Sequence, residues 1–141
     1  MTRLNCLARG WYEDQQVRNA AGHEVKQPYF NSCPSSELIA FAALRSVWTR
    51  PDAEGERGDP VISCALLSRA AAPAIANIHP RMPVVLSPDH YATWLDATTP
   101  APEVERMITQ ARDDFSAYPV STQVGDVRHD LLARVDTASE D

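Results

Sequence analysis

Two short stretches of this sequence carry side chains suited to acid–base chemistry. His79 lies in the stretch 77–86, just before an apolar run, and Glu13 closes the motif Arg9-Gly10-Trp11-Tyr12-Glu13. A carboxylate and an imidazole can pass a proton between them near neutral pH, because the unperturbed imidazole pKa lies close to neutrality. Each stretch alone is ambiguous, since a histidine beside a proline is often a loop residue and a turn glutamate often faces solvent.

The elements that must position Glu13 read as a β-hairpin. Residues 6–12 have the pattern of a strand interrupted at Arg9-Gly10, and residues 27–30 read as the returning strand. The polar segment between them contains Asn19-Ala20-Ala21-Gly22, which is typical of a turn. We therefore expect a hairpin over residues 6–30.

His79 is expected between a short helix at residues 70–76 and a strand at residues 82–86. A histidine at that place could instead cap the preceding helix, where a positive charge is favourable. Ser87-Pro88 then predicts a helix that starts with an N-cap and a proline and runs to about Asp96. A second amphipathic helix is predicted at residues 102–112.

The remaining elements are less distinct. Residues 38–44 fit a helix or a buried strand equally well, because a short apolar run does not show its periodicity. Residues 50–60 read as a charged loop, 61–67 as a strand, and 115–121 and 124–128 as a closing strand and its continuation. The predicted core consists of Phe41, Ile62, Leu66, Val84, Leu86, Trp94, Met107 and Ile108.

Composition sets the broad class of protein. The chain has 141 residues, of which 44% are hydrophobic and 23% charged, as expected of one globular domain. The net charge of −6 argues against a broad nucleic-acid-binding surface but permits a local basic cleft. Cys6, Cys33 and Cys64 show neither metal-ligand spacing nor a disulfide framework, so we expect buried thiols and a cytoplasmic protein. No span is long enough to cross a membrane.

Five motifs in a fixed order make the sequence resemble a known family. They are Cys6-Leu7 with Gly10-Trp11-Tyr12-Glu13, Lys26-Gln27-Pro28-Tyr29-Phe30, Ile39-Ala40-Phe41-Ala42-Ala43-Leu44, Ile78-His79-Pro80-Arg81-Met82-Pro83-Val84 and Tyr118-Pro119-Val120-Ser121-Thr122. Together they resemble the SOS response-associated peptidase (SRAP) family, which processes abasic sites in single-stranded DNA. The resemblance implies an α+β fold of mixed, mainly antiparallel β-sheet or open barrel with short helices.

The resemblance also implies roles for individual residues. In the family reaction an N-terminal cysteine joins the aldehyde of an abasic site through a Schiff base and a thiazolidine ring. By motif, Glu13 and His79 match the catalytic glutamate and histidine, and Ser68 falls where the family has an active-site threonine. Arg81 matches an arginine that contacts DNA phosphate. Trp11 is a DNA-binding candidate by base stacking, although packing within the hairpin is the competing interpretation. The resemblance implies no metal and no cofactor.

The match covers only the C-terminal part of the family, over about residues 5–130. Family members begin with a cysteine after methionine removal and carry an Asn-Ala-Arg motif in their N-terminal half, whereas this sequence has Thr2. We therefore expect residues 1–136 to be the C-terminal portion of an SRAP domain with an incomplete fold, and 137–141 to be an acidic disordered tail. Crosslinking is expected to be lost, and either a separate N-terminal fragment or self-association is expected.

Three functions are consistent with these observations. The first is an abasic-site processing enzyme of the DNA-damage response, located in the cytoplasm or with the nucleoid when bound to DNA. The second is a non-catalytic remnant that binds single-stranded DNA weakly or pairs with an N-terminal half. The third, an unrelated metal or acid–base hydrolase, is disfavoured because no further ligand falls at metal-site spacing. The first predicts that Glu13 and His79 lie within about one bridging water, with Arg81 at the rim.

Overall fold

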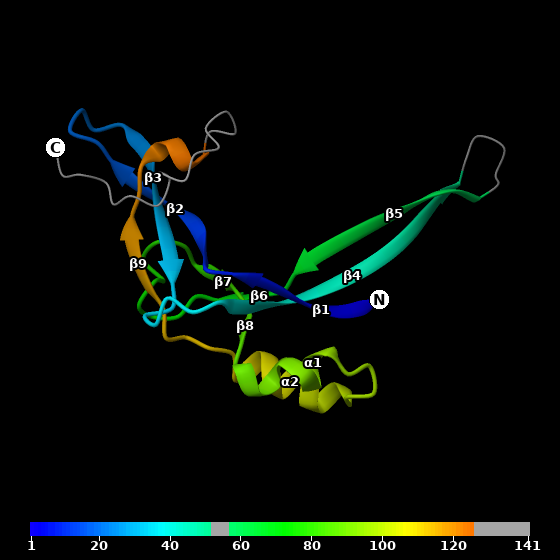
Figure 1. The fold of residues 1–141 in the computed structure, drawn as a ribbon. Helices are drawn as coiled ribbons and strands as arrows, with labels where there is room; N and C mark the ends of the chain where they lie inside the picture. The colour runs from blue at the N-terminus through cyan, green and yellow to red at the C-terminus, as the bar shows by residue number, and fades with distance from the viewer. Residues whose placement is uncertain (52–56, 126–141) are drawn as a thin grey trace. The chain divides into compact units, whose positions relative to one another are not determined.

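The computed structural model describes residues 1–51 and 57–125, which form two compact units. Of the described residues, unit 1 comprises those within Met1–Leu7, Ala40–Arg69 and Pro83–Arg112; unit 2 comprises Ala8–Ile39, Ala70–Met82 and residues 113–125. Residues 24–32 pair antiparallel with 10–18 and with 116–119, and residues 39–51 pair antiparallel with 57–66 and with 85–86. The described strands form open sheets rather than a closed barrel (Figure 1). The α+β class expected from the sequence is therefore confirmed.

The sheet of unit 1 is built around one long strand. β4 (Ile39–Pro51) lies between β1 (Thr2–Ala8) and β5 (Arg57–Leu66), and β8 (Val85–Leu86) also pairs with β4. The choice left open for residues 38–44 is thus settled in favour of strand. Residues Ile39 to Ala43 are all buried, which explains why this stretch lacks the alternation of a half-exposed strand.

Two short helices pack beside this sheet. The 3-10 helix η1 (Pro88–His90) leads into α1 (Tyr91–Leu95), and α2 (Ala101–Thr109) follows (Figure 1). Both predicted helices are present, although the Ser87 side chain makes no capping hydrogen bond. The core of unit 1 joins sheet and helices through Ala42, Val84, Leu86, Trp94, Met107 and Ala111. Ile108 packs against this cluster.

Unit 2 contains the predicted hairpin, but over residues 10–32 rather than 6–30, because residues 6–8 belong to β1 in the other sheet. β2 (Gly10–Arg18) and β3 (Glu24–Ser32) pair from Gly10↔Ser32 to Arg18↔Glu24, and β9 (Ser116–Pro119) adds to the other edge of β3. The turn falls where the sequence predicts it, with Gly22 at a φ of +81° that an L side chain rarely adopts. Because side chains alternate along a strand, Trp11, Glu13 and Gln15 share one face of β2.

Gly10 begins β2 at a point where this strand lies very close to β3. A Cβ added at this residue would collide with the backbone carbonyl of Asn31 and lie 2.7 Å from Cζ of Phe30. The backbone of β2 therefore approaches β3 and its aromatic ring more closely than a side chain would permit. The sequence motif reads as an interruption because Arg9 lies outside both strands.

The segment between β6 (Ser68–Ala70) and β7 (Arg81–Pro83) is a series of turns. The predicted helix over residues 70–76 is wrong: residues 71–80 contain no helix, and Ile75 N–H bonds to the Ala72 carbonyl as in a turn. Pro73 removes one backbone donor, and the buried side chains are too few to define a helical face. Ile75 and Ile78 instead anchor the segment by burial.

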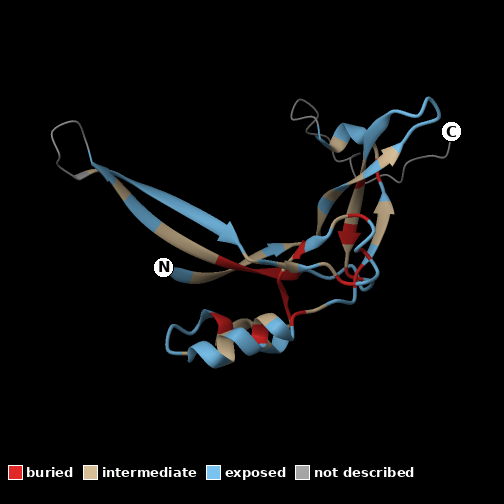
Figure 2. Ribbon diagram, turned by 180° about the vertical axis from the view of Figure 1, so that it is seen from behind, coloured by how far each residue is buried: buried red, intermediate tan, exposed pale blue. Residues whose placement is uncertain are grey.

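Several further expectations require correction. Ile62 and Leu66 are exposed, as is Cys64, because β5 is an edge strand that pairs only with β4 in the described structure (Figure 2). The predicted loop over 50–60 is too long, since β5 already begins at Arg57. Thr122–Gly125 forms a 3-10 helix, η2, rather than the predicted strand over 124–128; residues 126–128 lie outside the described residues.

Other expectations stand or remain open. Phe41, Val84, Leu86, Trp94 and Met107 are buried as predicted. Cys33 is buried, whereas Cys6 is only half-buried. The expected tail over 137–141 lies outside the described residues. Among the helices of the described ranges, none combines the length and apolar character needed to cross a membrane.

Candidate active site

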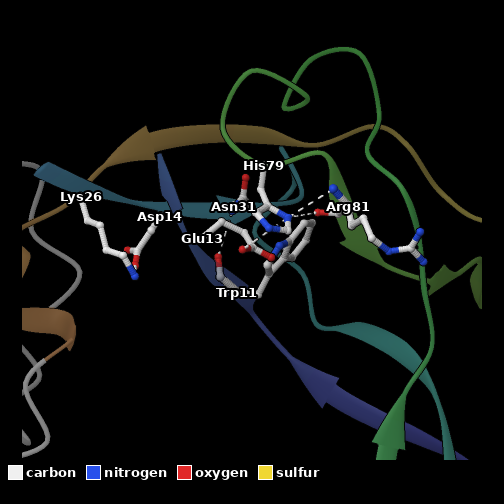
Figure 3. A network of polar contacts seen from close by, with 7 residues as sticks. All are labelled: Trp11, Glu13, Asp14, Lys26, Asn31, His79 and Arg81. Carbon is white, nitrogen blue, oxygen red and sulfur yellow. Dashed lines mark hydrogen bonds and ion pairs between the residues drawn. The ribbon is translucent and has the colours of Figure 1, made fainter. Parts of the chain in front are cut away.

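Glu13 and His79 converge within unit 2, as the sequence predicts. Glu13 Oε2 lies 3.9 Å from His79 Nδ1, a separation that permits an ion pair when the imidazole is protonated (Figure 3). The Glu13 side chain is 26% exposed and that of His79 44% exposed. The separation exceeds hydrogen-bonding distance, so the contact is an ion pair, and both groups are open enough to meet a ligand.

The segment that carries His79 is fixed to β2 on the face of Glu13. Gln15 Nε2 donates a hydrogen bond to the Asn77 carbonyl at 2.8 Å, and Gln15 lies two residues beyond Glu13 on the same strand face. Ala71 N–H bonds to the Pro80 carbonyl at 3.0 Å and closes the base of the segment. With Ile75 and Ile78 buried below, these bonds set the histidine opposite the carboxylate.

The backbone of Arg81 can hold the imidazole in more than one protonation state. The backbone nitrogen of Arg81 lies 3.2 Å from His79 Nδ1, and its N–H donates a hydrogen bond to Nδ1 when Nδ1 carries no proton. The Arg81 carbonyl oxygen lies 2.9 Å from Nδ1 and accepts a hydrogen bond when Nδ1 is protonated. One nitrogen cannot do both at once. The ring can thus change its proton while the backbone of Arg81 keeps it close to Glu13.

Burial is the main influence on Glu13. It raises the pKa of the Glu13 carboxyl, His79 opposes the rise by its positive charge, and the neighbouring Asp14 adds to it. A carboxyl with a raised pKa holds a proton closer to neutral pH than an ordinary glutamate does. The pair therefore has the electrostatic character of an acid–base couple.

A pocket of about 490 Å³ opens beside the pair. Its lining combines polar, charged and aromatic groups from β2, β3, η2 and the His79 segment: Tyr12, Glu13, Asp14, Gln16, Lys26, Pro28, His79, Val124 and Gly125. Lys26 Nζ lies 3.3 Å from Asp14 Oδ2, an exposed ion pair that is worth little in stability. The pocket is large enough for a nucleotide-sized group.

The other predicted site residues occupy different positions. The backbone of Arg81 contacts His79, while its exposed side chain extends away from the Glu13–His79 pair (Figure 3). Ser68 is exposed in β6 and belongs to unit 1, whereas the pair belongs to unit 2. The Trp11 ring packs edge-on against Phe115 with centroids 5.1 Å apart. The competing interpretation of Trp11 as a packing residue thus has a physical basis.

Sequence reasoning missed residues that shape this site. Tyr12 lines the pocket, is 42% exposed and begins an aromatic row, with its ring 5.0 Å from Phe30 and the Phe30 ring 5.8 Å from Tyr118. Gln15 fixes the His79 segment. Extending the strand alternation to residue 18 would have placed Gln15 on the face of Glu13, whereas Tyr12 lies on the opposite face of β2. Asn31 is 1% exposed and donates to the Trp11 carbonyl at 3.3 Å, a contact that no sequence pattern indicates.

The chain matches one protein family and several of its curated members. Residues 2–127 match the model of the family described as SOS response associated peptidase (SRAP). Curated relatives include the abasic site processing protein YoqW of Bacillus subtilis, 31% identical over 72% of this chain and 44% of the relative. YedK of Escherichia coli is 29% identical over 90% of this chain and 54% of its own. HMCES of Gallus gallus is 31% identical over 91% of this chain and 41% of its own.

Solved structures share the fold. A protein from Bacteroides thetaiotaomicron superposes with a TM-score of 0.78 at 16% identity, covering 98% of this chain and 57% of that one. A protein from Bordetella bronchiseptica superposes with a TM-score of 0.64 at 21% identity, covering 85% and 55%. This chain spans about half the length of the curated relatives it matches.

Proposed function

Because this chain belongs to the SOS response-associated peptidase family, we propose that it acts on abasic sites in single-stranded DNA. The observation that carries the proposal is the 3.9 Å approach of Glu13 Oε2 to His79 Nδ1 beside the pocket. The matched relatives are named as abasic site processing proteins. In this proposal the chain contributes to the DNA-damage response as a DNA-associated protein.

The chemistry that fits the pair is capture of the sugar aldehyde by an amine. An amine adds to the aldehyde carbon, and loss of one water leaves a Schiff base. A thiol on the same amine-bearing residue then adds to the imine carbon and closes a thiazolidine ring. Each step moves a proton, and Glu13 and His79 are placed to give and take it as general acid and base. The raised pKa of the Glu13 carboxyl supports the acid role.

DNA contacts are assigned to groups around the pair. Arg81 is exposed and follows His79 by two residues, so its guanidinium is the proposed phosphate ligand. Tyr12 offers an exposed ring in the pocket on which a base can stack, with Trp11 as the second aromatic candidate. The role of Ser68 stays a prediction from the family resemblance. No metal or cofactor takes part in this proposal.

The cysteines within these 141 residues do not supply the amine for that reaction. Residue 2 is Thr2, and the backbone nitrogen of Cys6 is held in a peptide bond. Cys6 therefore cannot present a free amine and thiol on one residue. We propose that a residue outside these 141, or a small aminothiol, supplies the amine and the thiol.

The experiment uses free cysteine as that aminothiol. A uracil-containing oligonucleotide is treated with uracil glycosylase and mixed with cysteine, with and without the chain. The mass of the oligonucleotide then reports thiazolidine formation over time. Faster capture with the chain, and none on the intact oligonucleotide, supports the proposal. Capture at the same rate with and without the chain overturns it.

A non-catalytic pairing role is the second candidate, and exposed apolar side chains favour it. The outer part of the β4–β5 hairpin (residues 45–51 and 57–66, the β4–β5 arm) exposes apolar side chains to solvent. They are Val47, Trp48, Val61, Ile62 and Leu66, each 49% exposed or more. Val47 faces Ile62 and Trp48 faces Val61 in the ladder, so successive pairs place apolar groups on both faces of the arm.

Such a surface is suited to covering by another polypeptide. The proposed partner is a chain that carries the part of the family fold absent from this match, with self-association as the competing outcome. Light scattering of the wild type and Trp48→Glu separates them: a concentration-dependent dimer lost in the variant indicates self-association. A wild-type monomer that binds an N-terminal SRAP fragment, with Trp48→Glu failing to bind, indicates the pairing role. A monomer that binds no fragment contradicts both.

A further inference from the structure

Asn31 is a buried amide whose oxygen has no partner among the residues that the structure describes. It is 1% exposed on β3, and its Nδ2 donates a hydrogen bond to the Trp11 carbonyl at 3.3 Å. Since that carbonyl can only accept, the amide nitrogen faces it and Oδ1 is the atom left over. Oδ1 is buried and makes no hydrogen bond within the described ranges. An unpaired buried carbonyl oxygen is costly, so we looked for a donor that can reach it.

The strand register identifies Glu13 as the nearest candidate donor. Trp11 stands opposite Asn31 in the ladder, and the next residue on the same face of β2 is Glu13. Asn31 and Glu13 are therefore diagonal cross-strand neighbours, which lie about 7–8 Å apart, within reach of a long side chain such as glutamate. The hydrogen bond to the Trp11 carbonyl turns the Asn31 amide toward β2, and Asn31 enters the network of Glu13 and His79 from β3 (Figure 3).

We propose that Asn31 is a positioning residue for Glu13: its Oδ1 accepts a hydrogen bond from the protonated Glu13 carboxyl and holds this acid beside His79. Among the described residues, the Glu13 carboxyl has an ion pair with His79 at 3.9 Å but no hydrogen bond. Its acidic proton therefore needs an acceptor, just as Asn31 Oδ1 needs a donor. The inference deepens the proposed function, because it concerns the acid of the same pair, but its test requires no DNA.

The proposed hydrogen bond exists only while Glu13 carries its proton. Ionisation removes the donor and leaves two oxygens whose lone pairs repel, so Asn31 favours the protonated form. This effect acts in the same direction as the burial that raises the pKa of Glu13, and against the His79 charge that lowers it. The other ionisable groups beside Glu13 are Asp14, which also raises this pKa, and Tyr29, which stands opposite in the ladder, while the Arg81 guanidinium extends away (Figure 3).

An NMR titration of the Glu13 side-chain carboxyl, identified by its loss in Glu13→Gln, tests the proposal. Asn31→Leu keeps the branched shape of asparagine and excludes water, whereas Asn31→Ala opens the site to water. Both remove the acceptor, so the proton affinity of Glu13 should fall in both, by roughly two- to tenfold for one ordinary hydrogen bond. Asn5→Leu is the matched control, because Asn5 Oδ1 is also buried without a hydrogen-bond partner but belongs to unit 1. It should leave the titration of Glu13 unchanged.

Urea unfolding adds a readout that a purely structural asparagine would not affect. The loss of unfolding free energy caused by Asn31→Leu should be largest at acidic pH, where Glu13 is protonated, and should shrink as pH rises through the folded-state pKa of Glu13. In the Glu13→Gln background the side-chain amide supplies a donor at every pH. The loss caused by Asn31→Leu should then be independent of pH.

Two results would overturn the proposal. If the proton affinity of Glu13 rose in Asn31→Leu and fell in Asn31→Ala, Asn31 would act only by controlling the access of water. If the affinity were unchanged in both variants, and the loss of stability were independent of pH in both backgrounds, Asn31 would be a packing residue alone. Failure of the proposed function is seen separately: the titration differences would persist in a chain that does not accelerate capture of an abasic site by cysteine.

Discussion

The indole of Trp94 donates a hydrogen bond from Nε1 to the Leu4 carbonyl at 2.9 Å. Arg3, on the same strand as Leu4, also contacts Trp94. Its Nε donates a hydrogen bond to the Trp94 carbonyl at 2.6 Å, and its guanidinium lies 5.7 Å from the indole centroid. β1 is thereby fastened to α1 through one fully buried side chain. The strand that precedes the Glu13 hairpin depends on this contact for its place in unit 1.

Trp94→Ala is expected to lower the free energy of unfolding by about 3–5 kcal/mol, since it removes the largest fully buried side chain and leaves a cavity. Trp94→Phe keeps most of the packing and loses the hydrogen bond, and should cost roughly 1–2 kcal/mol. Urea unfolding measures both, with exposed Leu66→Ala as a control expected to change stability little. Equal losses for Trp94→Ala and Leu66→Ala would show that Trp94 is not a core residue.

Gly10→Ala is expected to destabilise the hairpin by about 1–3 kcal/mol, because the added methyl meets the Asn31 carbonyl and the Phe30 ring. Gly125→Ala is the matched control: no atom lies within 4 Å of its added Cβ and its φ is not strained. Thermal unfolding of the two variants gives the comparison. If the two variants have the same thermal midpoint of unfolding, β2 and β3 are not as close at Gly10 as described.

The sequence predicted correctly the secondary-structure elements that capping and turn residues define. It predicted wrongly the burial of residues whose environment depends on tertiary packing. The Ser87-Pro88 signal and the turn before Gly22 located a helix and a hairpin, because capping and turn residues act within a few positions. Ile62 and Leu66 were assigned to the core from their apolar character, yet both are exposed on β5, an edge strand that pairs only with β4 among the described strands. Apolar character does not reveal which strand lies at an edge.

In the candidate site, too, local sequence signals and tertiary packing determine different features. Glu13 and His79 were paired through a family motif, and their approach follows from tertiary contacts such as that of Gln15 with Asn77. Residues 70–76 were predicted as a helix from alanine content, whereas Pro73 and the burial of Ile75 and Ile78 produce turns. Tyr12 and Lys26 enter the pocket from adjacent strands, which only the strand register brings together.

Glu13→Gln is expected to change the pH dependence of stability. The folded-state pKa of Glu13 is raised, so its contribution to stability is fully present below the unfolded pKa of about 4.3 and is lost as pH rises through the folded pKa. Gln cannot ionise and avoids this loss. Urea unfolding from acidic to neutral pH should show that the free energy of unfolding of the variant increases relative to that of the wild type as pH rises. If the free energy of unfolding of the variant instead fell relative to the wild type with rising pH, burial would not be the dominant influence on the pKa of Glu13.

Arg81→Glu is expected to weaken binding of single-stranded DNA roughly tenfold at low salt, because it reverses the charge at the proposed phosphate contact. The difference should shrink as salt rises and screens the charges. Arg106→Glu makes the same charge change on exposed α2 and serves as the control. Fluorescence anisotropy with a labelled oligonucleotide measures both. Equal weakening by the two variants would indicate a general effect of net charge rather than a contact at Arg81.

The most direct test is the rate at which Glu13→Gln and His79→Gln variants promote capture of an abasic site by free cysteine. General acid–base catalysis contributes on the order of a hundredfold or more, so each variant should fall toward the rate without protein. The double variant should be no slower than either single one, since the two residues act as a couple. Asp14→Asn, which alters a carboxylate in the same pocket, should keep most of the activity. Wild-type rates in both variants would contradict the assignment of Glu13 and His79 as the acid–base pair.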